Sequence, residues 1–157
     1  MRDVGNQEDI STEKSRANES EIDFLKRAGR EVRDFSDRNE VEGCGKICVT
    51  EDPAGVKSYA IKFTTNDSHI GCATGPCADG YKETGETLHS HGTSSTVRAN
   101  VADEVLSGGK YLQGTRISGQ DLFHFSAQDF ATGAGYLAAP HDLLYQKGER
   151  NQIDYGN

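Results

Sequence analysis

One long amphipathic segment, followed by short alternating ones, constrains the fold of this chain more than any other feature. The segment SEIDFLKRAGREVRDF begins with Ser20, a residue type that caps helix N-termini, and Asp23 follows three residues later, as in a capping box. Apolar residues then recur at helical spacing, at Ile22, Leu25, Ala28 or Gly29, Val32 and Phe35. This pattern predicts an α-helix over about 21–35.

Shorter segments after this helix alternate apolar and polar residues, which is the two-residue period of a β-strand. In GKICVTEDPAGVKSYAIKFTTND, Ile47 and Val49 alternate before the turn EDPAG, and Tyr59, Ile61 and Phe63 alternate after it. The segment therefore predicts two strands joined by a turn. A loop over about 66–83 follows, and the next strand is expected around ETLHSH.

The second half of the chain mixes helical and strand patterns. STVRANVADEVLSGG predicts a short helix that stops at Gly108 and Gly109, because glycine commonly follows the end of a helix. The segment ISGQDLFHFSAQDFATG predicts a helix over about 119–132, and GYLAAP and LLYQKG predict a final pair of strands. This order of elements predicts an α+β (mixed α/β) domain, a single sheet flanked by helices.

The length of 157 residues suits one domain. Residues 1–18 are polar and charged, with almost no large apolar side chains, which is typical of a disordered arm or linker. We therefore expect such an arm over 1–18, one folded domain over 19–150 and a tail over 151–157.

The formal net charge of −8 is not broken by any basic cluster, so a nucleic-acid partner is not expected. The apolar runs are far shorter than a transmembrane helix needs, and the first residues lack the apolar stretch of a signal peptide. We expect a soluble protein, or a soluble piece of a larger one, without a membrane partner. It is either cytoplasmic in the producing cell or delivered and secreted.

The four cysteines fall in two pairs, Cys44 with Cys48 and Cys72 with Cys77. A four-thiolate zinc site is one interpretation, although zinc knuckles usually have tighter spacing. A disulfide between Cys72 and Cys77 would close a small loop in an oxidising compartment, and free thiols are the third possibility. The redox state of the cysteines stays open at this point.

The motif LHSHG places His89 and His91 two residues apart on an expected strand. Side chains alternate between the faces of a strand, so both imidazoles project from the same side. Neutral imidazole is a good zinc ligand, and a catalytic zinc site usually has three protein ligands and an open position. Two exposed histidines on an edge strand are the simpler interpretation, and a third ligand would favour a metal.

A third ligand is available from the motif SxxD, which occurs twice, as Ser118 with Asp121 and as Ser126 with Asp129. A serine that caps a helix holds the acid three residues later near the positive end of that helix. Upstream, Glu42 stands at an expected strand start beside glycines that let other backbone approach closely, so it is a candidate general base.

In this order, Glu42, the HxH motif and the SxxD motifs resemble the JAB/MPN (JAMM) metallopeptidase family. In that family a helix precedes a strand start of the form E-x-C-G-x-L, which Glu42, Cys44, Gly45 and Ile47 match. The ending GYLAAPHDLLYQKG is similar to JAB-like domains at the C-termini of bacterial RHS-type polymorphic toxins. The resemblance covers about 20–148. The chain departs from it at Gly92, where the family has proline, and by a helix-sized insertion before the serine.

The resemblance implies a cytidine deaminase-like fold and a zinc ion held by His89, His91 and Asp121. It also implies that Glu42 is the general base and that Ser118 helps to stabilise the oxyanion. Asp129 with Ser126 is the alternative to Asp121 with Ser118. We prefer Ser118 because a helix that began at Ser126 would have only about six residues before Gly133.

The function implied by the resemblance is zinc-dependent hydrolysis of a peptide or isopeptide bond by a bacterial effector, toxin or processing domain. The expected partners are a peptide or protein substrate and either a parent polypeptide or a cognate immunity protein. A non-catalytic JAB-like binding or scaffold module is the alternative, and a nuclease-type toxin fits the acidic charge poorly. The residues do not identify the substrate.

Overall fold

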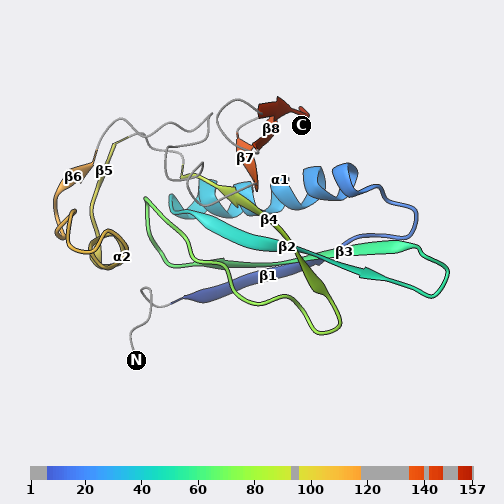
Figure 1. Ribbon diagram of the computed structural model, residues 1–157. Helices are drawn as coiled ribbons and strands as arrows, with labels where there is room; N and C mark the ends of the chain where they lie inside the picture. Colours follow the sequence, from blue (N-terminus) through green and yellow to red (C-terminus); the bar gives the residue numbers. More distant parts are fainter. Residues whose placement is uncertain (1–6, 93–95, 118–134, 140–141, 147–151, 157) are drawn as a thin grey trace.

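The computed structural model describes residues 7–92, 96–117, 135–139, 142–146 and 152–156. Within these residues one long helix lies across one face of a twisted sheet, and a small unit lies at one end (Figure 1). The strands of the large sheet are β1 Glu8–Lys14, β2 Gly43–Glu51, β3 Lys57–Thr65, β4 Lys82–Ser90, β7 Gly135–Ala139, β8 Asp142–Gln146 and β9 Gln152–Asp154. The helix is α1 Glu21–Asn39, and the small unit contains β5 Val97–Arg98, α2 Val101–Leu106 and β6 Arg116–Ile117.

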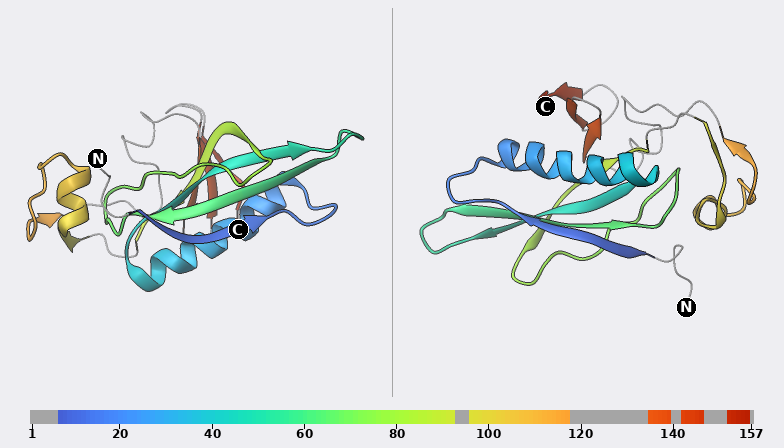
Figure 2. Two further views of the ribbon diagram at one scale, coloured as in Figure 1. Left: turned by 90° about the horizontal axis from the view of Figure 1, so that it is seen from below. Right: turned by 180° about the vertical axis from the view of Figure 1, so that it is seen from behind.

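The strand order in the large sheet is β1-β3-β2-β4-β7-β8-β9. The pair β4–β7 is parallel and every other pair in this sheet is antiparallel. Strands β5 and β6 form a separate antiparallel pair. The prediction of an α+β domain is confirmed at this level. The sheet is covered by α1, whereas α2 stands apart with β5 and β6 (Figure 2).

The helix α1 follows from its sequence pattern and from its two ends. The Ser20 hydroxyl accepts a hydrogen bond from the Asp23 backbone N–H at 3.1 Å, which confirms the predicted N-cap. The helix continues one turn beyond the predicted end, because Ser36 occupies a buried position there and its hydroxyl is hydrogen-bonded to that of Ser90 on β4. Glu40 ends the helix in the left-handed conformation.

The core lies between α1 and the face of the sheet that it covers. Burial of these apolar side chains is the main favourable contribution to folding. Its buried members are Phe24, Leu25, Ala28, Val32, Ile47, Ile61, Phe63, Leu88, Tyr136, Ala138 and Leu143. The structure confirms five of the predicted strands and the second predicted helix. The strands are β2 (predicted around 47–49), β3 (59–63), β4 (86–91), β7 (135–140) and β8 (143–148), and the helix predicted before Gly108 is α2.

The expectation of a disordered arm over 1–18 is wrong for residues 8–14, which form β1. This strand pairs with β3 and forms the edge of the sheet, and Ile10 is its one apolar residue. An edge strand is held through main-chain hydrogen bonds, so it needs few apolar side chains, and its charged residues suit an exposed edge. The composition of the segment therefore gave the wrong expectation.

No helix among the described residues is long and apolar enough to cross a membrane.

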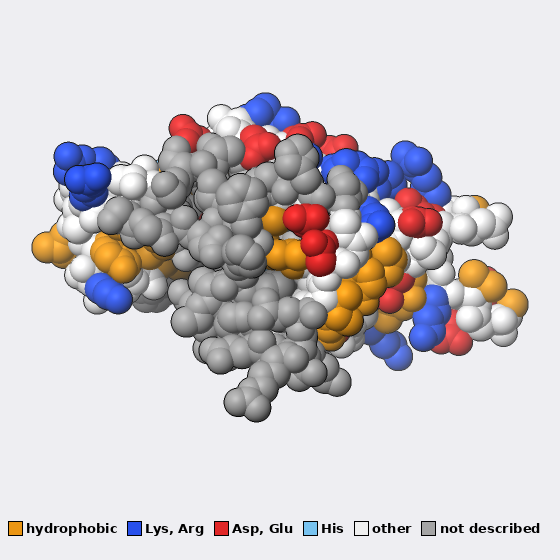
Figure 3. Space-filling model, turned by 90° about the horizontal axis from the view of Figure 1, so that it is seen from above, with side chains coloured by type: hydrophobic (Ala, Val, Ile, Leu, Met, Phe, Trp, Pro, Cys, Tyr) orange, Lys and Arg blue, Asp and Glu red, His pale blue; other side chains and the backbone are white. Residues whose placement is uncertain are grey.

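The space-filling view from above shows the side of the molecule that carries α1 and β8, and acidic side chains there lie beside exposed apolar ones (Figure 3).

Candidate functional site

The two histidines of the HxH motif meet at the end of β4. The Nε2 atoms of His89 and His91 are 3.2 Å apart, and their ring centroids are 5.0 Å apart with the planes tilted by 55°. Both side chains are half-buried. The prediction that the two imidazoles project from the same side is therefore confirmed, although β4 ends at Ser90 and His91 follows it.

Ser90 determines the direction of both imidazoles. Its buried hydroxyl donates to the Val32 backbone carbonyl at 3.1 Å and is also hydrogen-bonded to Ser36, so it faces α1. Its neighbours in the strand must then project from the opposite face of the sheet. His89 and His91 are consequently on the face that α1 does not cover.

Glu42 immediately precedes β2, and β2 is the strand that pairs with β4 on this side. Gly43 is opposite Ser90 and Cys44 is opposite His89, so Glu42 continues this register beside His91. Its backbone is fixed on both sides, since its N–H donates to the Ser68 carbonyl at 2.8 Å and its carbonyl accepts from the Thr65 hydroxyl at 2.7 Å. The register therefore brings the predicted base to the same end of the sheet as the predicted ligands.

The glycines beside these residues permit the close approach of backbone that the sequence suggested. A Cβ atom at Gly43 would lie 2.8 Å from Val32 Cγ2, so glycine is needed there for α1 to pack on β2. A Cβ atom at Gly92 would lie 2.7 Å from the Glu40 carbonyl oxygen. At the position where the resembled family has proline, this chain thus packs directly against the backbone that leads into Glu42.

Two disulfides tie the segment after β3 to β2. Cys44 is bonded to Cys72 and Cys48 to Cys77, so the interpretations as a zinc site, free thiols or a Cys72–Cys77 pair are all wrong. Cys44 and Cys48 are four residues apart on one strand and face the same side, which allows both to reach the segment that crosses it. Disulfides indicate an oxidising compartment.

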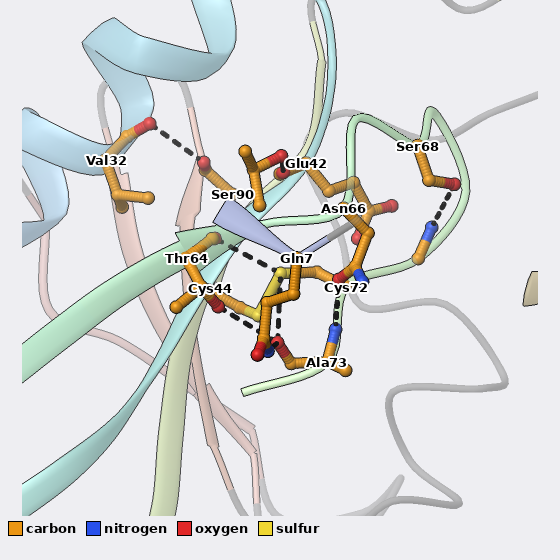
Figure 4. Close-up of a disulfide and its surroundings, with 12 residues drawn as sticks. Gln7, Val32, Glu42, Cys44, Thr64, Asn66, Ser68, Cys72, Ala73 and Ser90 are labelled. Atoms are coloured by element: carbon orange, nitrogen blue, oxygen red, sulfur yellow. Dashed lines mark hydrogen bonds between the residues drawn. A yellow bond between two sulfur atoms is a disulfide. The ribbon is translucent and has the colours of Figure 1, made fainter. Parts of the chain in front are cut away.

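Hydrogen bonds hold the same segment beside the Cys44–Cys72 bond (Figure 4). The Ala73 N–H donates to the Asn66 side chain at 2.7 Å, and the Ala73 carbonyl accepts from Thr64 at 2.9 Å and from Gln7 at 2.7 Å. The disulfide, these bonds and the Glu42–Ser68 bond together fix the segment from residue 66 to residue 73 beside Glu42 and Cys44.

A buried carboxylate that the sequence interpretation missed stands behind this segment. The fully buried Asp103 carboxylate accepts hydrogen bonds from the Ser68 hydroxyl at 2.6 Å, from the His69 backbone N–H at 2.7 Å and from the Asn100 N–H at 2.9 Å. It also pairs with His69 Nδ1 at 2.7 Å. Burial opposes ionisation, but these hydrogen bonds prevail and lower the pKa of Asp103.

His69 lies in the loop after β3, and its side chain is paired with Asp103 rather than simply solvated. The one available sequence signal was the capping box of α2, in which the Asn100 side chain accepts from the Asp103 N–H. That signal places Asp103 at a helix start but does not reveal a partner 34 residues away in the sequence. The network links α2 to the segment that supports Glu42.

The remaining predicted site residues, Ser118, Asp121, Ser126 and Asp129, lie outside the described residues, as does the predicted helix over 119–132. Within the described ranges no group of three or more histidine, cysteine or acidic side chains is arranged to hold a metal ion. The structure thus brings together His89, His91 and the backbone of Glu42.

Two nitrogen ligands at about 2.0–2.1 Å from a tetrahedral zinc ion lie about 3.4 Å from each other. The 3.2 Å between the two Nε2 atoms is close to this value, so the pair can contribute two ligands to one ion. It is also a hydrogen-bond distance between a donor ring and an acceptor ring.

Comparison with known proteins gives no family for this chain. No protein-family model matches it, and neither a curated protein nor a solved structure shows significant similarity to it.

Proposed function

We propose that the protein is a zinc-dependent hydrolase of peptide or isopeptide bonds, of the JAB/MPN (JAMM) type with a cytidine deaminase-like arrangement. The observation that carries the proposal is the 3.2 Å approach of His89 Nε2 to His91 Nε2, beside the strand start that bears Glu42. The donor set fits zinc, because imidazole nitrogen is among its preferred ligands. The third ligand would be Asp121, with Asp129 as the alternative.

Each residue of this chain would have a distinct role. His89 and His91 would bind the ion, and the hydrogen bonds that hold Ser90 on α1 would orient both rings. When bound, zinc would lower the pKa of a water molecule to about 7 and polarise the carbonyl of the scissile amide. Glu42 would accept the proton of the attacking water, and Ser118 would donate a hydrogen bond to the oxyanion.

The two disulfides support a protein that works in an oxidising environment, as a delivered or secreted effector does. The proposed substrate is a peptide or protein, with no nucleic-acid or membrane partner. A parent polypeptide or a cognate immunity protein would be the other partner.

The proposal is tested by the zinc content of the purified protein and of two single variants, His89→Ala and His91→Ala. We expect about one zinc per chain in the wild type and a loss in each variant, because an open site that loses one of three ligands binds weakly. His69→Gln is the matched control, since this histidine is paired with Asp103 and should not affect zinc content. Full zinc content in either HxH variant would refute the site.

A non-catalytic module is the second candidate, because the same 3.2 Å separation allows a hydrogen bond between the two rings without a metal. Wild-type protein that takes up no zinc after purification in zinc-containing buffer would favour this candidate. In that case the ring NMR signals of His89 and His91 should not shift when zinc is added.

A further inference from the structure

The small unit of β5, α2 and β6 carries two arginines directly opposite each other. Arg98 on β5 pairs with Arg116 on β6 in the register of these two strands, so both side chains project from the same face. Both residues are exposed. We refer to Arg98 and Arg116 as the arginine pair. Like charges in directly opposite positions destabilise a pair of strands, so this arrangement calls for an explanation.

The arginine pair has no acidic counter-ion within the described part of the chain. Arg98 donates a hydrogen bond to the Gly114 carbonyl at 3.2 Å, but a carbonyl does not neutralise its charge. The two acidic residues of the unit have other partners. Asp103 is buried against the loop after β3, and Glu104 accepts a hydrogen bond from the Gln113 backbone N–H at 2.9 Å. The pair is thus a local positive charge at the surface.

Exposed apolar side chains lie on the same unit. Of the five large apolar side chains that are exposed among the described residues, three belong to it, Val101 at 60%, Val105 at 40% and Leu112 at 59%. Val101 and Val105 are four residues apart on α2 and share one side of the helix. In the view from above, basic and apolar side chains lie together at the end of the molecule where the small unit stands (Figure 3). Exposed apolar groups that gather in one place are typical of interaction sites.

Hydrogen bonds hold this surface in place before any partner binds. The Ala99 N–H donates to the Thr115 carbonyl at 2.7 Å, and the Ala99 carbonyl accepts from the Gly114 N–H at 2.7 Å. The capping box between Asn100 and Asp103 fixes the start of α2, directly after β5. Binding to a surface that is already ordered costs little conformational entropy.

We propose that the arginine pair and the exposed apolar side chains of the small unit bind an acidic segment of a partner protein. The planar guanidinium groups match carboxylates, with which they form paired, charge-assisted hydrogen bonds. Apolar side chains of the segment would cover Val101, Val105 and Leu112. The bound carboxylates would also relieve the repulsion within the arginine pair. The proposal does not rest on the proposed hydrolase function.

The charge of the chain favours a protein segment over an extended polyanion. Residues 96–117 contain three basic and two acidic residues, whereas the whole chain has a net charge of −8. A membrane surface or a nucleic acid presents negative charge over a wide area, which the rest of the chain would repel. A short acidic segment meets the small unit alone, because exposed charges more than about 10 Å away are largely screened at physiological salt.

The probe for this surface is a fluorescein-labelled helical peptide with glutamate along one face and leucine along the other. Its binding to the full chain is followed by fluorescence anisotropy, and a second peptide has glutamine in place of glutamate. We expect saturable binding of the glutamate peptide that weakens as salt is added, because salt screens the ion pairs. The glutamine peptide should bind on the order of tenfold more weakly, since it lacks charged partners for the arginine pair.

Arg116→Gln should weaken the glutamate peptide about threefold to tenfold, because it removes one of the two facing charges. Arg16→Gln is the matched control, since Arg16 is also exposed but lies in the turn between β1 and α1, at the other end of the molecule (Figure 1). Arg116→Gln should not lower the melting temperature measured by circular dichroism, because it relieves a like-charge contact with Arg98.

Val101→Thr tests the apolar contribution with the shape of the side chain kept, and it should weaken binding about threefold. Val56→Thr is its control, because Val56 is equally exposed at 60% and lies in the turn between β2 and β3. This control should bind like the wild type.

Three results would overturn the proposal at the level of binding. They are no saturable binding of the glutamate peptide by the wild type, equal binding of the glutamine peptide, and equal weakening by Arg16→Gln and Arg116→Gln. Tighter binding of phosphatidylglycerol vesicles or of a DNA duplex than of the glutamate peptide would overturn it in favour of a polyanion. A lower melting temperature of Arg116→Gln would also overturn it, because Arg116 would then have a partner within the chain.

Discussion

Removal of the two disulfides one at a time separates the stability of the fold from the integrity of the candidate site. The double variant Cys44→Ala/Cys72→Ala opens a loop with a sequence separation of 28, and Cys48→Ala/Cys77→Ala opens one of 29. Closing a loop of this size removes about 12 cal/mol/K of entropy from the unfolded chain, or about 3.6 kcal/mol at 25 °C. The two variants should therefore lose nearly the same free energy of unfolding.

The effects on the site should differ, because the two bonds lie at different distances from it along the strands. Cys44 is directly opposite His89 and two residues from Glu42, and Cys72 is close to the residues that support the Glu42 backbone. Cys48 is opposite Glu83, at the other end of the pairing between β2 and β4. Loss of Cys44–Cys72 should lower zinc affinity at least tenfold, and loss of Cys48–Cys77 should leave it within about twofold.

Urea unfolding at equilibrium measures the stability of each variant, and competition with a chelator measures zinc affinity under conditions where both variants remain folded. Each variant serves as the control for the other, since both lose two cysteines and one loop constraint. Equal zinc affinity in the two variants would refute the role given to Cys44–Cys72. A difference of more than about 2 kcal/mol between their stabilities would refute the loop-entropy reasoning.

Three further predictions concern single side chains. Glu42→Gln should keep zinc but lower the hydrolysis rate by about 10²–10⁴-fold on a substrate that the wild type cleaves, because the amide cannot accept a proton. Unchanged turnover would eliminate Glu42 as the base. Of Asp121→Asn and Asp129→Asn, only the first should lose zinc affinity, and the opposite result in a chelator competition would assign the third ligand to Asp129. The lowered pKa of Asp103 means that its ionisation stabilises the fold above the ordinary value of 3.8 and that this contribution is lost as the pH falls through the folded-state pKa. Urea unfolding between about pH 5 and pH 3 should therefore show a smaller loss of stability in Asp103→Asn than in the wild type, and parallel curves would contradict this.

The elements of the fold that bury an apolar stripe could be predicted from the sequence. Helix α1 and strands β2 and β3 have apolar residues at the period of their element, and these same residues form the core. The predicted end of α1 was too early because the last buried position holds Ser36, a polar residue whose partner Ser90 is 54 residues away. Periodicity identifies apolar contacts, and it does not identify a polar group that is buried by pairing.

The features that could not be predicted all depend on contacts between distant residues. Strand β1 is held by main-chain pairing with β3, and such pairing leaves little trace in composition. Four cysteines allow three pairings, and the observed one depends on the path of the segment that crosses β2. The pairing of His69 with Asp103 likewise could not be predicted, because it depends on the position of α2 beside residues 68 and 69.

The candidate site follows from alternation along one strand. In the sequence LHSH, Leu88 and Ser90 face α1, where Leu88 is fully buried in the core and Ser90 is bonded to the helix backbone. His89 and His91 must then share the opposite face, where their Nε2 atoms meet. One short motif thus anchors the strand with two residues and presents a ligand pair with the other two. A one-residue shift of β4 against β2 would bury both histidines under α1, so the packing of Leu88 and Ser90 is itself what holds the ligand pair on the face that α1 does not cover.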